Sequence, residues 1–176
     1  MTRPELLDVI YRHYPRGMLP IAREHVPFGE RVYDDTEEYL RLVAAARRGA
    51  DEYATWQALI RRLGPRHSLQ NESLRILAGW VDPAYSARIW LTRERALGFH
   101  VSLLGPYYGV HLPGVAGEDR VASEVVREIE AAYPGYQRVP PELGDEVVPD
   151  VATDGASLGE ATVYVCLFSL VWTWVP

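Results

Sequence analysis

The sequence predicts a single α+β domain in which an antiparallel β-meander packs against several α-helices. Three observations support this fold class. Apolar residues in the first third recur every three or four positions, as on one face of a helix. In the middle they alternate with polar residues, as in strands with one buried side. A strongly amphipathic helical segment then follows at 118–133. A chain of 176 residues suits one domain, so we expect 1–176 to form a single unit.

Residues 1–64 are expected to be mainly helical. Thr2 followed by Glu5 has the spacing of a capping box, which predicts a helix start near the N-terminus. The acids and threonine at 34–38 predict a second start, because such residues favour the first turn of a helix. A further piece at 51–63 carries aromatic and aliphatic residues at helical spacing.

Residues 74–112 are expected to be mainly strands. Segments 85–92 and 97–104 alternate with period two, and a turn at Gly105-Pro106 leads to a third strand at 107–112. The segment 74–80 is expected to supply a further strand. Chain reversal at the turn places the strands antiparallel.

The final segment, 137–176, is expected to combine an acidic loop with an apolar C-terminal element. Proline and acids dominate its first half, in which 146–151 is expected to form a short edge strand. Ser157 and Glu160 have capping-box spacing ahead of the apolar stretch 161–176, which favours a short helix there. The β-branched and aromatic content of that stretch would also suit a strand.

The charge distribution excludes some functions and favours others. All 18 basic residues are arginine, so chemistry that requires lysine, such as a P-loop or a Schiff base, is excluded. The whole net charge of −6 lies in 139–176, which has six acids and no base. A field of one sign disfavours nucleic acid and would steer a basic partner. A solubilising surface is the alternative interpretation.

Neither a disulfide nor a membrane anchor is expected. The single cysteine, Cys166, has apolar neighbours and is expected to be a buried, unreactive core residue. The apolar stretch 161–176 is shorter than the ~20 residues that span a bilayer. The first ten residues contain acids and no long apolar run, unlike a secretory signal. We therefore expect a cytoplasmic protein that does not interact with membranes.

The histidines provide a weak candidate for chemistry. His100 and His111 would face each other if the turn at Gly105-Pro106 is tight, with Glu118 as a third group. No metal-binding or nucleophile motif accompanies them. We expect no cofactor, no metal and no catalytic residue. A small enzyme or ligand-binding domain that uses His100 and His111 remains the alternative hypothesis.

Aromatic residues near the loops suggest a protein-binding surface, because tyrosine is favoured at the centre of protein interfaces. Together with the acids of the C-terminal segment they predict a patch for a basic protein partner. The residues assigned to this patch are Glu142, Asp145, Glu146, Asp150, Asp154, Tyr107, Tyr108 and Tyr136.

Short motifs in the C-terminal half resemble a group of bacterial immunity proteins that accompany polymorphic, contact-delivered toxins. The motifs are YPGY at 133–136, VVPDV at 147–151 and GEATVY at 159–164, followed by LFS at 167–169 and Trp172. The strand-rich middle, 97–112, is also similar. The composition, rich in arginine, alanine and glycine and poor in asparagine, is typical of a GC-rich bacterial gene.

The resemblance implies a cytoplasmic inhibitor without turnover that binds a cognate toxin and blocks its active site or substrate path. Many such toxins are basic nucleases, for which an acidic face is complementary. A structural or regulatory interaction module without a toxin is a third possibility, and the oligomeric state is left open.

Overall fold

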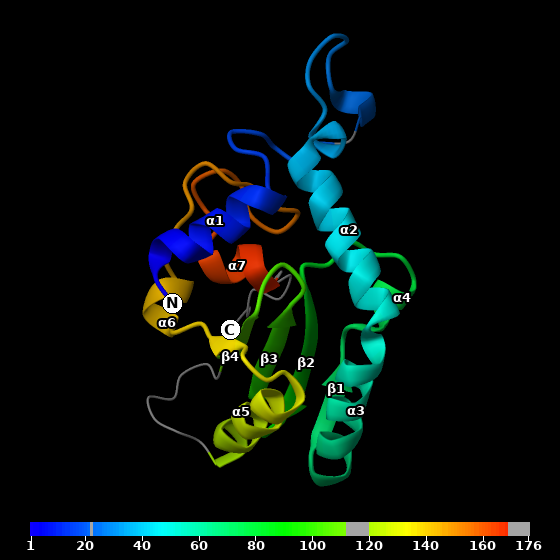
Figure 1. The fold of residues 1–176 in the computed structure, drawn as a ribbon, viewed down its shortest axis with the longest axis vertical. Helices are drawn as coiled ribbons and strands as arrows, with labels where there is room; N and C mark the ends of the chain where they lie inside the picture. The colour runs from blue at the N-terminus through cyan, green and yellow to red at the C-terminus, as the bar shows by residue number, and fades with distance from the viewer. Residues whose placement is uncertain (22, 112–119, 169–176) are drawn as a thin grey trace.

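A five-stranded sheet in the order β1-β2-β3-β4-β5 forms the centre of the fold (Figure 1). The computed structural model describes residues 1–21, 23–111 and 120–168. The helices are α1 (Arg3–His13), α2 (Glu37–Asp51), α3 (Tyr53–Leu63), α4 (Leu74–Leu77), α5 (Arg120–Ala132), α6 (Pro141–Gly144) and α7 (Val163–Phe168). The strands are β1 (Ser68–Asn71), β2 (Ala84–Trp90), β3 (Ala96–Ser102), β4 (Tyr107–His111) and β5 (Gln137–Arg138). The α+β class predicted from the sequence is confirmed.

The helix starts expected near the N-terminus are present. The backbone N–H of Thr2 donates to the Glu5 carboxylate at 2.6 Å, ahead of α1. The Thr36 hydroxyl accepts a hydrogen bond of 3.2 Å from the backbone N–H of Tyr39 and caps α2. Each contact satisfies a backbone donor that the first turn of a helix leaves free.

Strands β1 to β4 form an antiparallel meander, as expected, and β5 joins β4 in parallel. In the β2–β3 register, Ala87 pairs with Phe99 and Ser86 with His100. Because successive side chains point to opposite faces, Ala87 and Phe99 belong to one face and Ser86 and His100 to the other. Each face has a different cover.

The face that the alternation marks as apolar is covered by α3 and α5. Its buried residues include Tyr85, Ala87, Ile89, Leu97, Phe99 and Val101, which are the inward positions of the predicted strands. Trp56 of α3 stacks on Tyr85, with ring centroids 5.4 Å apart. Val125 and Ile129 of α5 are fully buried against the same face.

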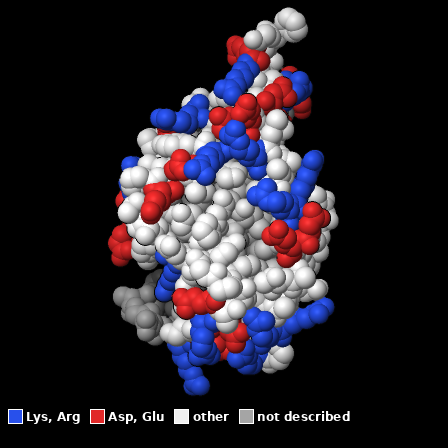
Figure 2. All heavy atoms as spheres, viewed as in Figure 1, with Lys and Arg blue, Asp and Glu red and all other residues white. Residues whose placement is uncertain are grey.

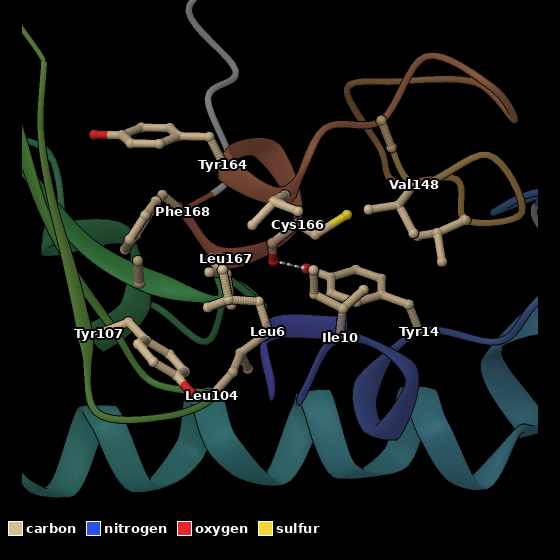
Figure 3. Close-up of a cluster of buried hydrophobic side chains, with 14 of the residues drawn as sticks. Leu6, Ile10, Tyr14, Leu104, Tyr107, Val148, Tyr164, Cys166, Leu167 and Phe168 are labelled. Atoms are coloured by element: carbon tan, nitrogen blue, oxygen red, sulfur yellow. Dashed lines mark hydrogen bonds between the residues drawn. The ribbon is translucent and has the colours of Figure 1, made fainter. Parts of the chain in front are cut away.

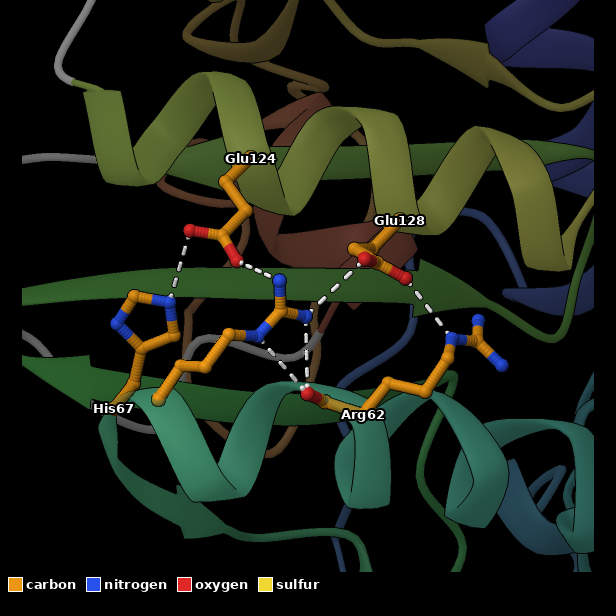
Figure 4. A network of polar contacts seen from close by, with 5 residues as sticks. Arg62, His67, Glu124 and Glu128 are labelled. Carbon is orange, nitrogen blue, oxygen red and sulfur yellow. Dashed lines mark hydrogen bonds and ion pairs between the residues drawn. The ribbon is translucent and has the colours of Figure 1, made fainter.

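A polar network joins the outer sides of α3 and α5 (Figure 4). The Arg62 guanidinium binds Glu128 at 2.9 Å, and Arg66, just after α3, binds both Glu124 and Glu128. His67 contacts the Glu124 carboxylate at 3.2 Å. These contacts hold the two helices together above the apolar layer.

The opposite face of the sheet is covered by α7, and α1 packs against α7; the sequence did not indicate this cover (Figure 3). Leu6 and Ile10 of α1 meet Leu167 and Phe168 of α7 in a second buried cluster. The segment 163–168 is a helix, as favoured, and the remaining expected element, 169–176, lies outside the described residues. Cys166 is fully buried, and burial raises the pKa of its thiol to about 12.

Three expectations for local structure were wrong. Segment 74–80 begins with the short helix α4 instead of a strand, because the Ser73 side chain bonds the backbone of Ser86 and ends the extended pairing there. Segment 146–151 makes a single bridge, Val147 to Thr162, and the fifth strand is β5 instead. The expected capping pair, Ser157 and Glu160, is bonded at 3.3 Å but closes a turn ahead of α7.

Among the described residues, no helix combines the length and the apolar character that crossing a membrane requires.

Candidate functional surface

The acidic C-terminal segment lies against α1 and uses two of its charges there. Glu146 forms an ion pair with Arg3 at the start of α1, and Asp150 forms one with Arg16 beyond its end. Tyr11 of α1 also donates its hydroxyl hydrogen to Asp150 at 3.1 Å. Burial raises the pKa of Asp150, but the hydrogen bonds from Arg16 and Tyr11 hold it below its usual value overall. These two carboxylates therefore neutralise arginines of the N-terminal region.

The other three predicted acids remain available to a partner. Glu142 in α6, Asp145 directly after it and Asp154 in the following loop are all exposed. Within the part of the chain that the structure describes, no basic group lies at ion-pair distance from any of the three. Their charge therefore faces solvent.

Asp154 lies beside aromatic side chains that the sequence analysis did not select. A small depression of about 30 Å³ is lined by Tyr14, Tyr33, Tyr39 and Asp154. The rings of Tyr33 and Tyr39 meet edge to face, with centroids 5.4 Å apart. Burial and the charge of Asp154 raise the pKa of Tyr33. In the sequence, Tyr33 and Tyr39 flank the acids at 34–38. That pattern predicted a helix start, and by itself it did not indicate a surface site.

The structure does not bring Tyr107, Tyr108 and Tyr136 together beside the acids. Tyr107 and Tyr108 are neighbours on β4, so they point to opposite faces of the sheet. Tyr107 is buried in the cluster under α7 (Figure 3). Tyr108 is 1% exposed and donates its hydroxyl hydrogen to Glu130 at 2.7 Å. Both are core residues because helices cover both faces.

Tyr136 is half-buried and lies on the α3–α5 side of the sheet. Its ring contacts that of Tyr133, with centroids 5.2 Å apart. The two rings belong to a cleft beside the end of α2. Tyr136 is therefore accessible, but in a different environment from the acids around α6.

His100 and His111 do not pair as a tight turn predicted. The register matches His100 with Gly109 and His111 with Gly98, because the bend between β3 and β4 is centred between Leu104 and Gly105, one residue earlier than a turn centred on Gly105-Pro106. The two histidines still share one face of the sheet, and both rings lie near Tyr164 of α7. The expected third group, Glu118, lies outside the described residues.

His100 is a buried side chain rather than a surface one. It is 7% exposed, and its Nδ1 lies 2.9 Å from the hydroxyl oxygen of Ser86. Burial, followed by the charges of His111 and Arg88, lowers its pKa to about 3. His100 is therefore neutral at physiological pH. Among the described residues, no group of three His, Cys, Asp or Glu side chains is placed to hold a metal ion.

Figure 2 shows the molecule from the same side as Figure 1, in which α1 and α6 as well as α3 and α5 are in view. Charged groups of both signs lie along the margins of this face, and its middle is uncharged. No protein-family model matches the chain, and neither a search of curated proteins nor a search of solved structures found a match.

Proposed function

We propose that this protein is an immunity-type inhibitor that binds a basic toxin domain and does not catalyse a reaction. The observation that supports this proposal is the exposure of Glu142, Asp145 and Asp154, whose carboxylates have no basic partner among the described residues. Three uncompensated charges on one segment attract a basic protein and speed its association.

The contact surface differs from the one expected from the sequence. Tyr107 and Tyr108 are excluded, because their side chains are buried. Glu146 and Asp150 act as internal ties to α1. The proposed surface consists of Glu142, Asp145 and Asp154, with Tyr39 beside Asp154.

The tyrosines next to Asp154 add chemistry suited to a basic partner. An arginine or lysine side chain gains from a carboxylate and also from the face of an aromatic ring. Tyr39 is half-buried, and its hydroxyl makes no hydrogen bond within the described residues. An inhibitor of this kind acts in the cytoplasm of the bacterium that makes the toxin, and we place the protein there.

Co-expression with the toxin tests the proposal. The wild-type chain is produced together with the protein encoded directly upstream, and growth and co-purification are measured. We expect a stable complex and relief of toxicity. The triple variant Glu142→Arg, Asp145→Arg and Asp154→Arg should fold normally, associate about tenfold or more slowly at low salt and protect poorly.

A matched triple variant controls for net charge. Glu24→Arg, Asp51→Arg and Glu94→Arg replace three exposed acids outside the acidic segment and change the net charge equally. This variant should protect like the wild type. Equal loss of protection in both variants would show that only the net charge matters. Full protection by the first variant would contradict the assigned surface. Absence of both complex and protection in the wild type would contradict the inhibitor function itself.

A further inference from the structure

The segment between α1 and α2 projects from the rest of the fold at the top of the view (Figure 1). It contains two short 3-10 helices, η1 (Arg23–His25) and η2 (Tyr33–Asp35), and the chain between them forms a loop. In Figure 2 uncharged atoms lie at the outer end of this projection, beyond charged groups of both signs. Side chains at this end can enter a recess on another molecule.

A tight turn at 27–30 presents Phe28 at its corner. The backbone N–H of Glu30 donates to the Pro27 carbonyl oxygen at 3.1 Å, which closes the turn. Gly29 occupies the third position with a φ of 90°, the left-handed conformation that a type II turn requires there and that glycine adopts without strain. The side chain of Phe28, at the second position, is fully exposed. Single exposed apolar residues are common, but here a defined turn holds an aromatic ring outward.

The base of the loop is fixed by two ion pairs and a buried ring. The Arg23 guanidinium binds the Asp35 carboxylate and joins the two limbs of the loop. Arg31 binds Glu38 of α2 at 3.6 Å. Tyr33, at the start of η2, is buried. A loop that is tied in this way loses less conformational entropy when it binds a partner.

The loop carries free negative charge next to the exposed ring. Both of its arginines are engaged in the ion pairs just described. Glu30 and Asp34, which follow Phe28, are exposed, and no basic group of the described ranges lies at ion-pair distance from either. Glu24 lies on the other limb and is not assigned to the contact. The free carboxylates favour a partner with basic groups and disfavour an anionic lipid surface.

The base of the loop adjoins the depression that contains Asp154. Tyr33 of η2 lines that depression together with Tyr39 and Asp154. Burial, and then the charges of Asp34 and Asp154, raise the pKa of Tyr39, so both carboxylates act on the same ring. The loop is therefore continuous with the contact surface proposed above.

We propose that Phe28 is the apolar anchor of the contact with the basic toxin domain and inserts into an apolar recess that basic groups surround. Glu30 and Asp34 meet those groups and extend the contact from Asp154. An aromatic side chain that fills a recess can supply much of the affinity of an interface, whereas peripheral charges act mainly on the association rate. This inference rests on the proposed function, because its partner is the toxin.

Binding kinetics of the purified chain with the protein encoded directly upstream test the proposal. Phe28→Ala should raise the dissociation rate about tenfold or more and leave the association rate within about twofold of the wild type. Glu30→Gln combined with Asp34→Asn should instead slow association about twofold or more at low salt. Because the Phe28 ring is fully exposed, Phe28→Ala should leave the midpoint of urea unfolding unchanged.

Two further variants make the result specific to the turn. Leu77→Ala removes another exposed apolar side chain, on α4, and should leave the dissociation rate unchanged. Gly29→Ala keeps the ring but strains the turn, so it should raise the dissociation rate less than Phe28→Ala does. Equal increases for Phe28→Ala and Leu77→Ala would overturn the proposal, since any exposed apolar residue would then have the same effect.

The remaining outcomes separate the anchor from the inhibitor function. A wild-type complex that forms and protects, but dissociates no faster with Phe28→Ala, would overturn the anchor and leave the inhibitor function intact. A wild-type chain that forms no complex would overturn both. Sedimentation with vesicles of phosphatidylcholine and phosphatidylglycerol that is lost in Phe28→Ala would assign the ring to a lipid surface and overturn its assignment to the toxin.

Discussion

Tyr14 directly follows α1, and its hydroxyl donates a hydrogen bond of 2.8 Å to the carbonyl oxygen of Cys166 in α7. The two residues are 152 positions apart in the chain, and their bond ties the end of α1 to α7 in the cluster on the second face of the sheet. Tyr14 is 3% exposed, so water does not compete for the contact. A buried polar contact within the apolar cluster therefore helps to hold α1 against α7.

Removal of this hydroxyl should destabilise the fold. Tyr14→Phe leaves the Cys166 carbonyl oxygen buried without this partner, which we expect to lower the free energy of unfolding by about 1–3 kcal/mol. Urea unfolding followed by circular dichroism measures the change. Tyr39→Phe is the control and should stay within about 0.5 kcal/mol of the wild type, because its hydroxyl makes no hydrogen bond within the described residues. Equal losses in the two variants would show that the bond does not stabilise the fold.

Gly109 of β4 should not tolerate a side chain. An added Cβ would come within 2.2 Å of the Tyr164 hydroxyl oxygen, so Gly109→Ala must displace α7 or the ring. We expect a loss of about 1–3 kcal/mol, as for other overpacked cores. Adding Tyr164→Phe removes the nearest clashing atom and should restore part of the loss. Thermal unfolding of the three variants measures these changes, and the control Gly155→Ala, which has open space around it, should be nearly neutral.

The network between α3 and α5 should stabilise the fold in a pH-dependent way. Hydrogen bonds from Arg62 and Arg66 hold the pKa of Glu128 below its ordinary value of 4.5. A lowered carboxyl pKa adds stability above the unfolded-state value, and that stability is lost as the pH falls through the lower folded-state value. Glu128→Gln should therefore cost about 0.5–1 kcal/mol near neutral pH, and the difference should shrink below about pH 4.

Chemical denaturation at several pH values checks this dependence. Glu142→Gln serves as the control, because within the described residues Glu142 has no ionic partner, and it should show no comparable change. If Glu128→Gln lowers the free energy of unfolding equally in acid and at neutral pH, the charge of Glu128 does not stabilise the network.

His100 should remain uncharged across the physiological range. Its pKa is lowered to about 3 by burial, so its ring carbon signals in NMR should not titrate between about pH 5 and 8. In the urea-unfolded chain the same signals should titrate near the ordinary value of 6.5. A native-state midpoint close to that value would mean that His100 is accessible to solvent.

The same difference predicts a loss of stability in acid. Below pH 6.5 the unfolded chain binds a proton at His100, whereas the folded chain binds it only below about pH 3. The stability of the wild type should therefore fall through this window. His100→Gln should show a weaker dependence, since it removes one of the groups that bind protons in the unfolded state.

Local features of the fold could be predicted from the sequence. The alternation around Ala87 and Phe99 identified the buried face correctly, because the side-chain period of a strand is independent of what covers it. Thr36 identified the start of α2, because a cap involves only residues three positions apart. The apolar neighbours of Cys166 correctly indicated a buried thiol.

The surface was decided by the tertiary structure. The acidic segment was expected to carry a uniform negative charge, but Arg3 reaches Glu146 across 143 residues and cancels part of it. Tyr107 and Tyr108 were selected as contact residues, yet α7 on one side and α3 with α5 on the other bury both. Which helix covers which face, and which charges meet, depends on contacts between distant segments, and the period and spacing of one sequence carry no information about such contacts.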